Sequence, residues 1–89
     1  MTLKLRDGVS LADTDYGMAL LDEHSGRYWN LNPTGALALR TLLAGGTTAQ
    51  VVQELTEQYA VDVETASRDV DDLLGELHAA GLVKEQAAS

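Results

Sequence analysis

Residues 26–36, with the sequence GRYWNLNPTGA, contain a change from strand-like to helix-like sequence. The segment 27–31 is rich in aromatic residues, which favour β-strands. Asn32 is a good helix N-cap, and Pro33 follows at the first helical position, where its missing N–H costs no hydrogen bond. The stretch therefore predicts a strand at 27–31 that leads directly into a helix.

Two further extended segments precede this strand. Residues 9–12 end at the turn-rich stretch 13–17, and residues 18–21 end at the polar stretch 22–26. The second polar stretch closes with Gly26, which can adopt the positive φ of a hairpin connection. Three short strands with short connections predict a three-stranded antiparallel sheet.

Three amphipathic helices are expected after this sheet. The first ends at Gly45–Gly46. Thr47 and Gln50 form a capping box for the second helix, and Asp62 caps a third helix over residues 63–80. The third helix has apolar residues at helical spacing over four turns, namely Val63, Ala66, Val70, Leu73, Leu74 and Leu77. We expect Leu82 and Val83 to be extended and residues 86–89 to fray.

This order of elements predicts one α+β domain over residues 1–89, a winged helix-turn-helix with a three-stranded antiparallel sheet followed by three helices. The chain has 89 residues, 14 of them acidic and 6 basic, and a formal charge of −8. Such a charge disfavours binding to nucleic acid or to an anionic membrane, since both require basic side chains. The N-terminal residues lack the apolar run of a signal peptide, so we expect a cytoplasmic protein.

The sequence offers little for catalysis or metal binding. It contains no cysteine, and His24 and Ser25 are neighbours in a predicted turn, where a nucleophile–base geometry is rare. Asp69, Asp72 and Glu76 share a face of the third helix, but three carboxylates do not complete the oxygen cage of a hard cation. They are typical of a solvated helix face, or of a docking surface for a basic segment. We therefore expect no catalytic residue, metal or cofactor.

Trp29 is the middle residue of the strand 27–31. By strand alternation it shares a face with Arg27 and Leu31, whereas Tyr28 and Asn30 lie on the other face. Trp29 is interpreted as a core anchor. The strand can also be a sheet edge, with backbone N–H and C=O groups free to accept another strand.

Two motifs and their surroundings resemble a known family. The residues GRYW (26–29) and LNPTGA (31–36), followed by a leucine-rich helix and Gly45–Gly46, resemble the PqqD-like family. Leu20-Leu21-Asp22 and the late set Leu73, Leu74, Leu77, Gly81, Leu82 and Val83 also fit, so the resemblance covers nearly the whole chain. Within the family, the chain is most similar to the stand-alone leader-binding proteins of lasso peptide biosynthesis.

The resemblance implies a RiPP recognition element without catalytic activity or cofactor. Such a domain binds the leader of a ribosomally made precursor peptide as an added strand along residues 27–31, beside helix 63–80. The implied partners are this leader, a cysteine-protease-like leader peptidase and, as a further candidate, an asparagine-synthetase-like cyclase. The implied peptide-binding residues are Arg27, Tyr28, Trp29, Asn30, Leu31, Asp69, Val70, Asp72, Leu73, Glu76 and Leu77.

Three alternatives stay open at this stage. A winged-helix nucleic-acid-binding protein fits the architecture but not the acidic third helix. A dimerisation module would use the free strand edge for self-pairing. An enzyme is the least favoured class, because no nucleophile–base arrangement is present.

Overall fold

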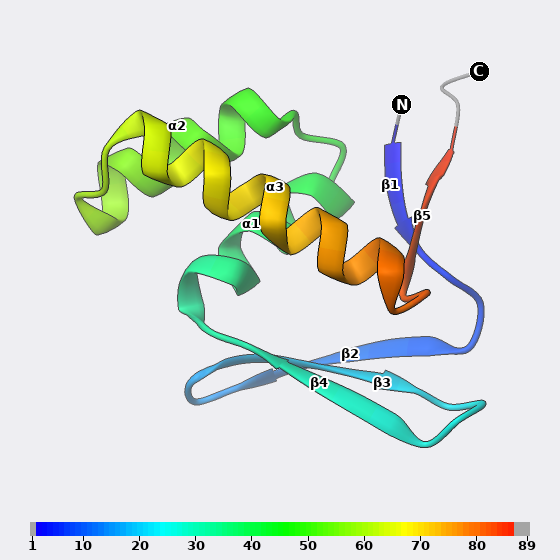
Figure 1. Cartoon of the computed structure of the whole chain (residues 1–89). Coiled ribbons are helices and arrows are strands. Elements are labelled where there is room, and N and C mark those ends of the chain that lie inside the picture. The colour runs from blue at the N-terminus through cyan, green and yellow to red at the C-terminus, as the bar shows by residue number, and fades with distance from the viewer. Residues whose placement is uncertain (1, 87–89) are drawn as a thin grey trace.

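The computed structural model of the protein describes residues 2–86. The described elements follow the order β1 (Thr2–Leu5), β2 (Val9–Thr14), β3 (Gly17–Asp22), β4 (Arg27–Leu31), α1 (Pro33–Leu43), α2 (Thr48–Tyr59), α3 (Val63–Ala79) and β5 (Val83–Gln86) (Figure 1). The α+β class, the three-stranded antiparallel sheet and the three helices after it are therefore confirmed.

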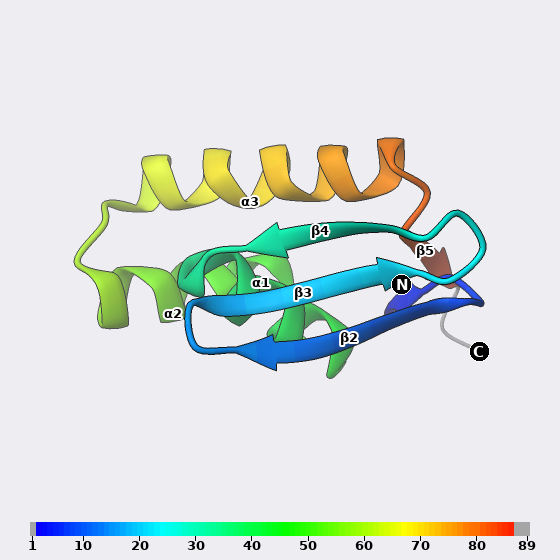
Figure 2. The same ribbon diagram turned by 90° about the horizontal axis from the view of Figure 1, so that it is seen from below.

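The larger sheet has the strand order β2-β3-β4 and is antiparallel throughout. Leu20 at its centre pairs with Leu11 of β2 and with Trp29 of β4, so these three side chains lie on one face. Leu20 is fully buried on this face, which is therefore the one that covers the core. Figure 2 shows α1 behind the sheet and α3 running alongside β4.

The smaller sheet was not predicted from the sequence. The prediction had no strand in the first residues, whereas β1 pairs with β5 in an antiparallel two-stranded sheet that joins the two ends of the chain (Figure 1). Leu3 and Val83 are 7% and 3% exposed, so their burial in the core stabilises this pairing. Gln86 belongs to β5 and pairs with Thr2, so the expected fraying is wrong at this residue. Residues 87–89 lie outside the described residues.

Each helix begins where local sequence predicts. The Asn32 side chain accepts a hydrogen bond from the backbone N–H of Gly35 at the start of α1. Thr47 and Gln50 form the capping box of α2, with both of its hydrogen bonds present. Asp62 caps α3, which ends at Ala79, one residue earlier than predicted.

The core lies between the larger sheet and the helices. Its buried residues are Leu3, Met18, Leu20, Ala36, Ala38, Leu39, Leu42, Val51, Leu55, Ala66, Val70, Leu77, Leu82 and Val83. α3 packs against α1, α2 and β5, whereas β4 packs against β3 and α1. Figure 2 shows that this arrangement places α3 beside β4.

Candidate binding groove

β4 is an edge strand. Within residues 2–86 it pairs with β3 on one side and with no strand on the other. Alternate residues of an edge strand direct their backbone N–H and C=O groups away from the sheet, where they can accept a further strand. In the structure, α3 runs along this open side of β4 (Figure 2).

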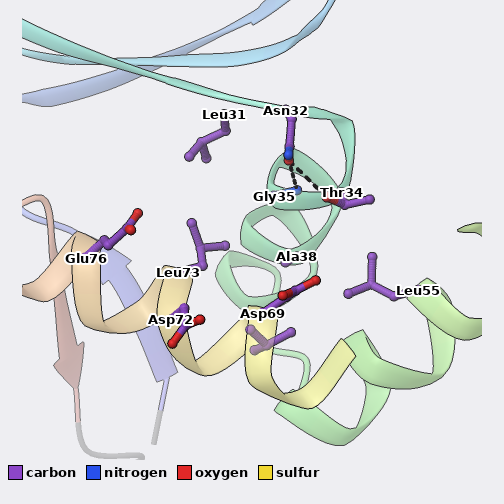
Figure 3. Close-up of a pocket in the computed structure, with 11 residues that line it drawn as sticks. Leu31, Asn32, Thr34, Gly35, Ala38, Leu55, Asp69, Asp72, Leu73 and Glu76 are labelled. Atoms are coloured by element: carbon purple, nitrogen blue, oxygen red, sulfur yellow. Dashed lines mark hydrogen bonds between the residues drawn. The ribbon is translucent and has the colours of Figure 1, made fainter. Parts of the chain in front are cut away.

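A pocket of about 320 Å³ lies between the C-terminal end of β4 and the middle of α3. This volume is at the lower end of the range typical for ligand sites. Leu31 of β4 and Leu73 of α3 point toward one another across it (Figure 3). The other lining residues are Asn32, Thr34, Gly35, Ala38, Leu55, Asp69, Val70, Asp72 and Glu76. The pocket therefore has apolar side chains from β4, α1, α2 and α3, with carboxylates on its α3 side.

A second pocket, of about 570 Å³, lies at the other end of the strand. It is lined by Asp22, Ser25, Arg27, Trp29, Glu76, Ala79 and Ala80. Glu76 lines both pockets, so the two adjoin and follow β4 along its length. We call the two pockets together the β4–α3 groove.

The side chains of β4 alternate as the sequence predicts. Trp29 and Leu31 are half-buried, line the groove and pack against the core. Tyr28 is 65% exposed and pairs with Leu21, which is itself 40% exposed, on the opposite face. Trp29 is therefore a partly buried residue at the border of the core, and the Arg27 guanidinium carbon lies 6.0 Å from the centre of its ring.

The electrostatic character of the groove is mainly acidic. Asp69, Asp72 and Glu76 are exposed and line its α3 side. At the hairpin end, the backbone N–H of His24 donates to Asp22 at 3.0 Å and holds the pKa of this carboxyl below its usual range. Arg27 is the one basic side chain among the described residues that line the groove.

The junction between β4 and α1 forms one end of the groove. A Cβ atom at Gly35 would lie 3.2 Å from the Asn32 side-chain oxygen and 3.5 Å from the Leu31 Cβ. A larger residue at this position would therefore press on the Asn32 side chain that caps α1, whereas its contact with Leu31 would be an ordinary van der Waals one.

Two of the predicted cleft residues differ from the rest. Val70 is only 2% exposed, so it belongs to the core as well as to the groove wall. Leu77 is 3% exposed, lies in the core and lines neither pocket of the groove. The resemblance implies a peptide-binding role for Leu77, whereas in this structure α3 turns its side chain toward the core.

Several lining residues were missed by the sequence analysis. Asn32, Thr34 and Gly35 stand in the same motif as the predicted strand, so the motif was the available signal. Ala38 and Leu55 come from α1 and α2, where nothing local distinguishes them from other core positions.

The groove offers no arrangement typical of catalysis. The Ser25 hydroxyl donates to Asp22 at 3.1 Å in the hairpin connection, as expected for a structured turn. Among residues 2–86, no group of three or more His, Asp or Glu residues is placed to hold a metal ion. None of the described helices combines the length and apolar character needed to span a membrane.

Comparison with known proteins relates the chain to a defined group. The family model described as coenzyme PQQ synthesis protein D (PqqD) matches residues 17–83. No curated protein sequence matches the chain. Among solved structures, a lasso peptide synthetase B1 complexed with the leader peptide is 44% identical, with a TM-score of 0.88 over 96% of this chain and 100% of that one.

Two further structures share the fold. TbiB1 in complex with the TbiA(beta) leader peptide is 29% identical, with a TM-score of 0.81, and the match covers 96% of this chain and 99% of that one. The PqqD truncation of Methylobacterium extorquens PqqCD, described as a stand-alone RiPP recognition element, is 23% identical. Its TM-score is 0.72 over 93% of this chain and 88% of that one, which shows a common fold.

Proposed function

The chain belongs to the PqqD family, and from this premise we propose that it binds the leader segment of a ribosomally synthesised precursor peptide of the lasso type. The segment adds as a strand to the open edge of β4, beside α3, and inserts side chains into the β4–α3 groove. The observation that carries this proposal is the unpaired edge of β4 next to a groove with apolar side chains. Two solved relatives described as leader-peptide complexes support the choice of ligand.

The energetics require both the edge and the groove. Ordering a flexible peptide costs about 2–5 kcal/mol or more. Backbone hydrogen bonds contribute about 1 kcal/mol each, so the few bonds of a short added strand give little net binding free energy after the ordering cost. Two or three apolar side chains buried in the groove contribute about 1.5–3 kcal/mol each and give the net affinity.

Apart from Leu77, the predicted binding residues divide into four roles in this proposal. Trp29, Leu31 and Leu73 contact the peptide through their side chains in the groove. Tyr28 and Asn30 contribute backbone groups only, because their side chains lie on the opposite face of the sheet. Val70 supports the groove wall from the core, and Arg27, Asp69, Asp72 and Glu76 provide its charges.

The protein acts as an adaptor and has no catalytic role in this proposal. It presents the bound leader to a cysteine-protease-like leader peptidase, and the precursor then passes to an asparagine-synthetase-like cyclase. Its location is the cytoplasm, where ribosomes release such precursors. The fold is a variant of the winged helix-turn-helix, with the β2–β4 sheet as the wing. The carboxylates of α3 disfavour the nucleic-acid alternative, since the helix that would enter a DNA groove repels phosphate.

Leu73→Asp tests the proposal more cleanly than the same change at Val70, since Val70 is a core residue whose loss also destabilises the fold. Leu73 is half-buried, and an aspartate there removes an apolar contact and adds a fourth carboxylate to the α3 side. We expect a loss of about 2–3 kcal/mol, or roughly 30- to 150-fold in Kd. The measurement is calorimetric titration with the leader peptide of the 44%-identical relative as the probe.

Val63→Asp is the matched control. Val63 also lies on α3, is 63% exposed and lines neither pocket of the groove. We expect wild-type affinity for this variant. If Leu73→Asp binds the probe as tightly as the wild type does, the peptide does not bind in the groove. Sedimentation tests the dimerisation alternative, which is supported if the protein forms a dimer that does not bind the probe.

A further inference from the structure

The β4–α3 groove contains three carboxylates beside its apolar side chains. Asp69, Asp72 and Glu76 all line the groove on its α3 side. Their spacing of three and four residues places them along one face of the helix. Glu76 occupies the central position, since it lines both pockets.

The fold does not use these carboxylates. Across the described range 2–86, none of the three takes part in an ion pair or a side-chain hydrogen bond. The ion pairs that do occur lie elsewhere: Arg40 with Asp13 and Arg68 with Glu64. His78 lies 3.8 Å from the carboxylate of Glu85, also outside this set. The carboxylates therefore repel one another beside apolar side chains, which disfavours the empty groove and favours a cationic occupant.

The basic side chain of the groove lies at its other end. Arg27 stands at the start of β4, over the ring of Trp29, and shares the second pocket with Glu76. In residues 2–86, no ion pair joins Arg27 to Glu76. The α3 side of the groove thus has carboxylates alone, whereas at the hairpin end the guanidinium of Arg27 stands beside the carboxylates of Asp22 and Glu76.

From this pattern, and resting on the proposed function, we infer that the groove selects a leader segment that carries a lysine or arginine next to its apolar anchors. Glu76, Asp72 and Asp69 are the specificity-determining residues that receive this side chain. The apolar anchors fix the segment along β4, and the cation fixes its register against α3.

Dimensions agree with this assignment. Asp69 and Glu76 are seven positions apart on α3, which corresponds to about 10 Å along the helix axis. An extended strand covers that distance in about three residues. One flexible lysine or arginine on the bound segment therefore reaches the carboxylates from any of about three neighbouring positions.

The experiment is a selection of displayed random twelve-residue peptides on the full chain and on the triple variant Asp69→Asn, Asp72→Asn, Glu76→Gln. A second triple variant, Asp15→Asn, Glu57→Gln, Asp71→Asn, has the same change in net charge outside the groove and serves as control. We expect lysine or arginine to be enriched within a window of about three positions next to the apolar anchors in peptides selected by the wild type and the control. The groove variant selects the same apolar pattern without the basic residue.

Titration of one selected peptide and its Lys→Gln analogue (Arg→Gln if arginine is selected) completes the test. Exposed ion pairs change affinity by about two- to fivefold each, so we expect the groove variant to bind the basic peptide roughly tenfold more weakly than the control does. The two variants bind the glutamine analogue equally. The inference is overturned if the wild type selects apolar peptides without a basic residue, or if both triple variants lose the same affinity for the basic peptide. Either result leaves the proposed function intact. Selection of no groove-binding peptide overturns both.

Discussion

The side-chain oxygen of Asn32 accepts a hydrogen bond from the backbone N–H of Gly35 at 2.8 Å, and this bond joins the end of β4 to the first turn of α1. The same oxygen accepts from the Thr34 hydroxyl at 2.9 Å. Asn32, Thr34 and Gly35 also line the groove, so one cap both starts the helix and shapes the end of the candidate site (Figure 3).

Asn32→Ala removes this cap and leaves the backbone N–H of Gly35 without its partner. We expect the free energy of unfolding to fall by about 1 kcal/mol, measured by denaturant unfolding. Asn32→Asp is the control, since aspartate caps helices as well as asparagine does. A loss in Asn32→Asp equal to that in Asn32→Ala would show that the hydrogen bond is not the cause.

Gly17, the first residue of β3, lies against the end of β4. Its φ is +145°, and a Cβ atom there would lie 2.0 Å from the backbone oxygen of Leu31 and 2.9 Å from the carbonyl carbon of Asn32. Gly17→Ala therefore combines backbone strain with a clash against main chain that cannot move freely. We expect a loss of about 3 kcal/mol or more in the free energy of unfolding.

Gly26 provides the comparison for that variant. It also has a positive φ, of 74°, but no atom lies within 4 Å of the Cβ position. Gly26→Ala has the conformational cost alone, of about 1 kcal/mol. Chemical denaturation of both variants separates the two effects, and equal losses would contradict the close contact of Gly17 with β4.

Acid weakens the start of α3. The backbone N–H of Thr65 donates to the Asp62 carboxylate at 2.7 Å and holds the pKa of Asp62 below its usual range. Because the unfolded chain then binds protons more readily than the folded one, the contribution of Asp62 is present above the unfolded pKa of about 3.9 and is lost as the pH falls through the folded value. We expect the free energy of unfolding to decrease between pH 5 and pH 2, a range in which Asp22 acts in the same direction.

Asp62→Asn tests the assignment, since asparagine keeps the cap without a titrating group. The variant should lose less stability than the wild type when the pH is lowered over this range, as measured by denaturant unfolding at several pH values. Identical pH dependence of the two proteins would exclude Asp62 as a source of the acid sensitivity.

The sequence predicts those features that depend on neighbouring residues. The caps at Asn32, Thr47 and Asp62 were all predictable, because the N-cap side chain reaches a backbone N–H only three residues ahead. The alternation of β4, with Trp29 and Leu31 toward the helices, follows equally from local geometry.

Features that depend on distant residues were missed. β1 and β5 are four residues each and pair across the whole chain, with Lys4 opposite Lys84, so neither segment signals the other. The apolar stripe of α3 is wide enough to serve both the core and the groove, and the pattern does not separate Leu77 from Leu73. That distinction depends on where β4 lies relative to the helix.

The two edges of the larger sheet allow a direct test of strand addition. β2 and β4 each pair with β3 alone within the described residues, so both expose backbone groups. β4 has the groove beside it, whereas the side chains of β2 are mostly exposed and Asp13 of β2 pairs with Arg40 of α1. Backbone pairing alone would use either edge, and only β4 adds apolar burial.

We therefore expect the leader peptide of the 44%-identical relative to slow amide hydrogen exchange at β4 and not at β2. Protection should rise by about tenfold or more at alternate residues of Arg27–Leu31, because the intervening N–H groups already face β3. Residue-resolved exchange measured by NMR with saturating peptide gives this result directly. The unpaired amides of β2 serve as the internal control, since general stabilisation by a ligand slows both edges alike. Equal slowing at β2 and β4, or slowing at β2 alone, would contradict addition of the peptide to β4.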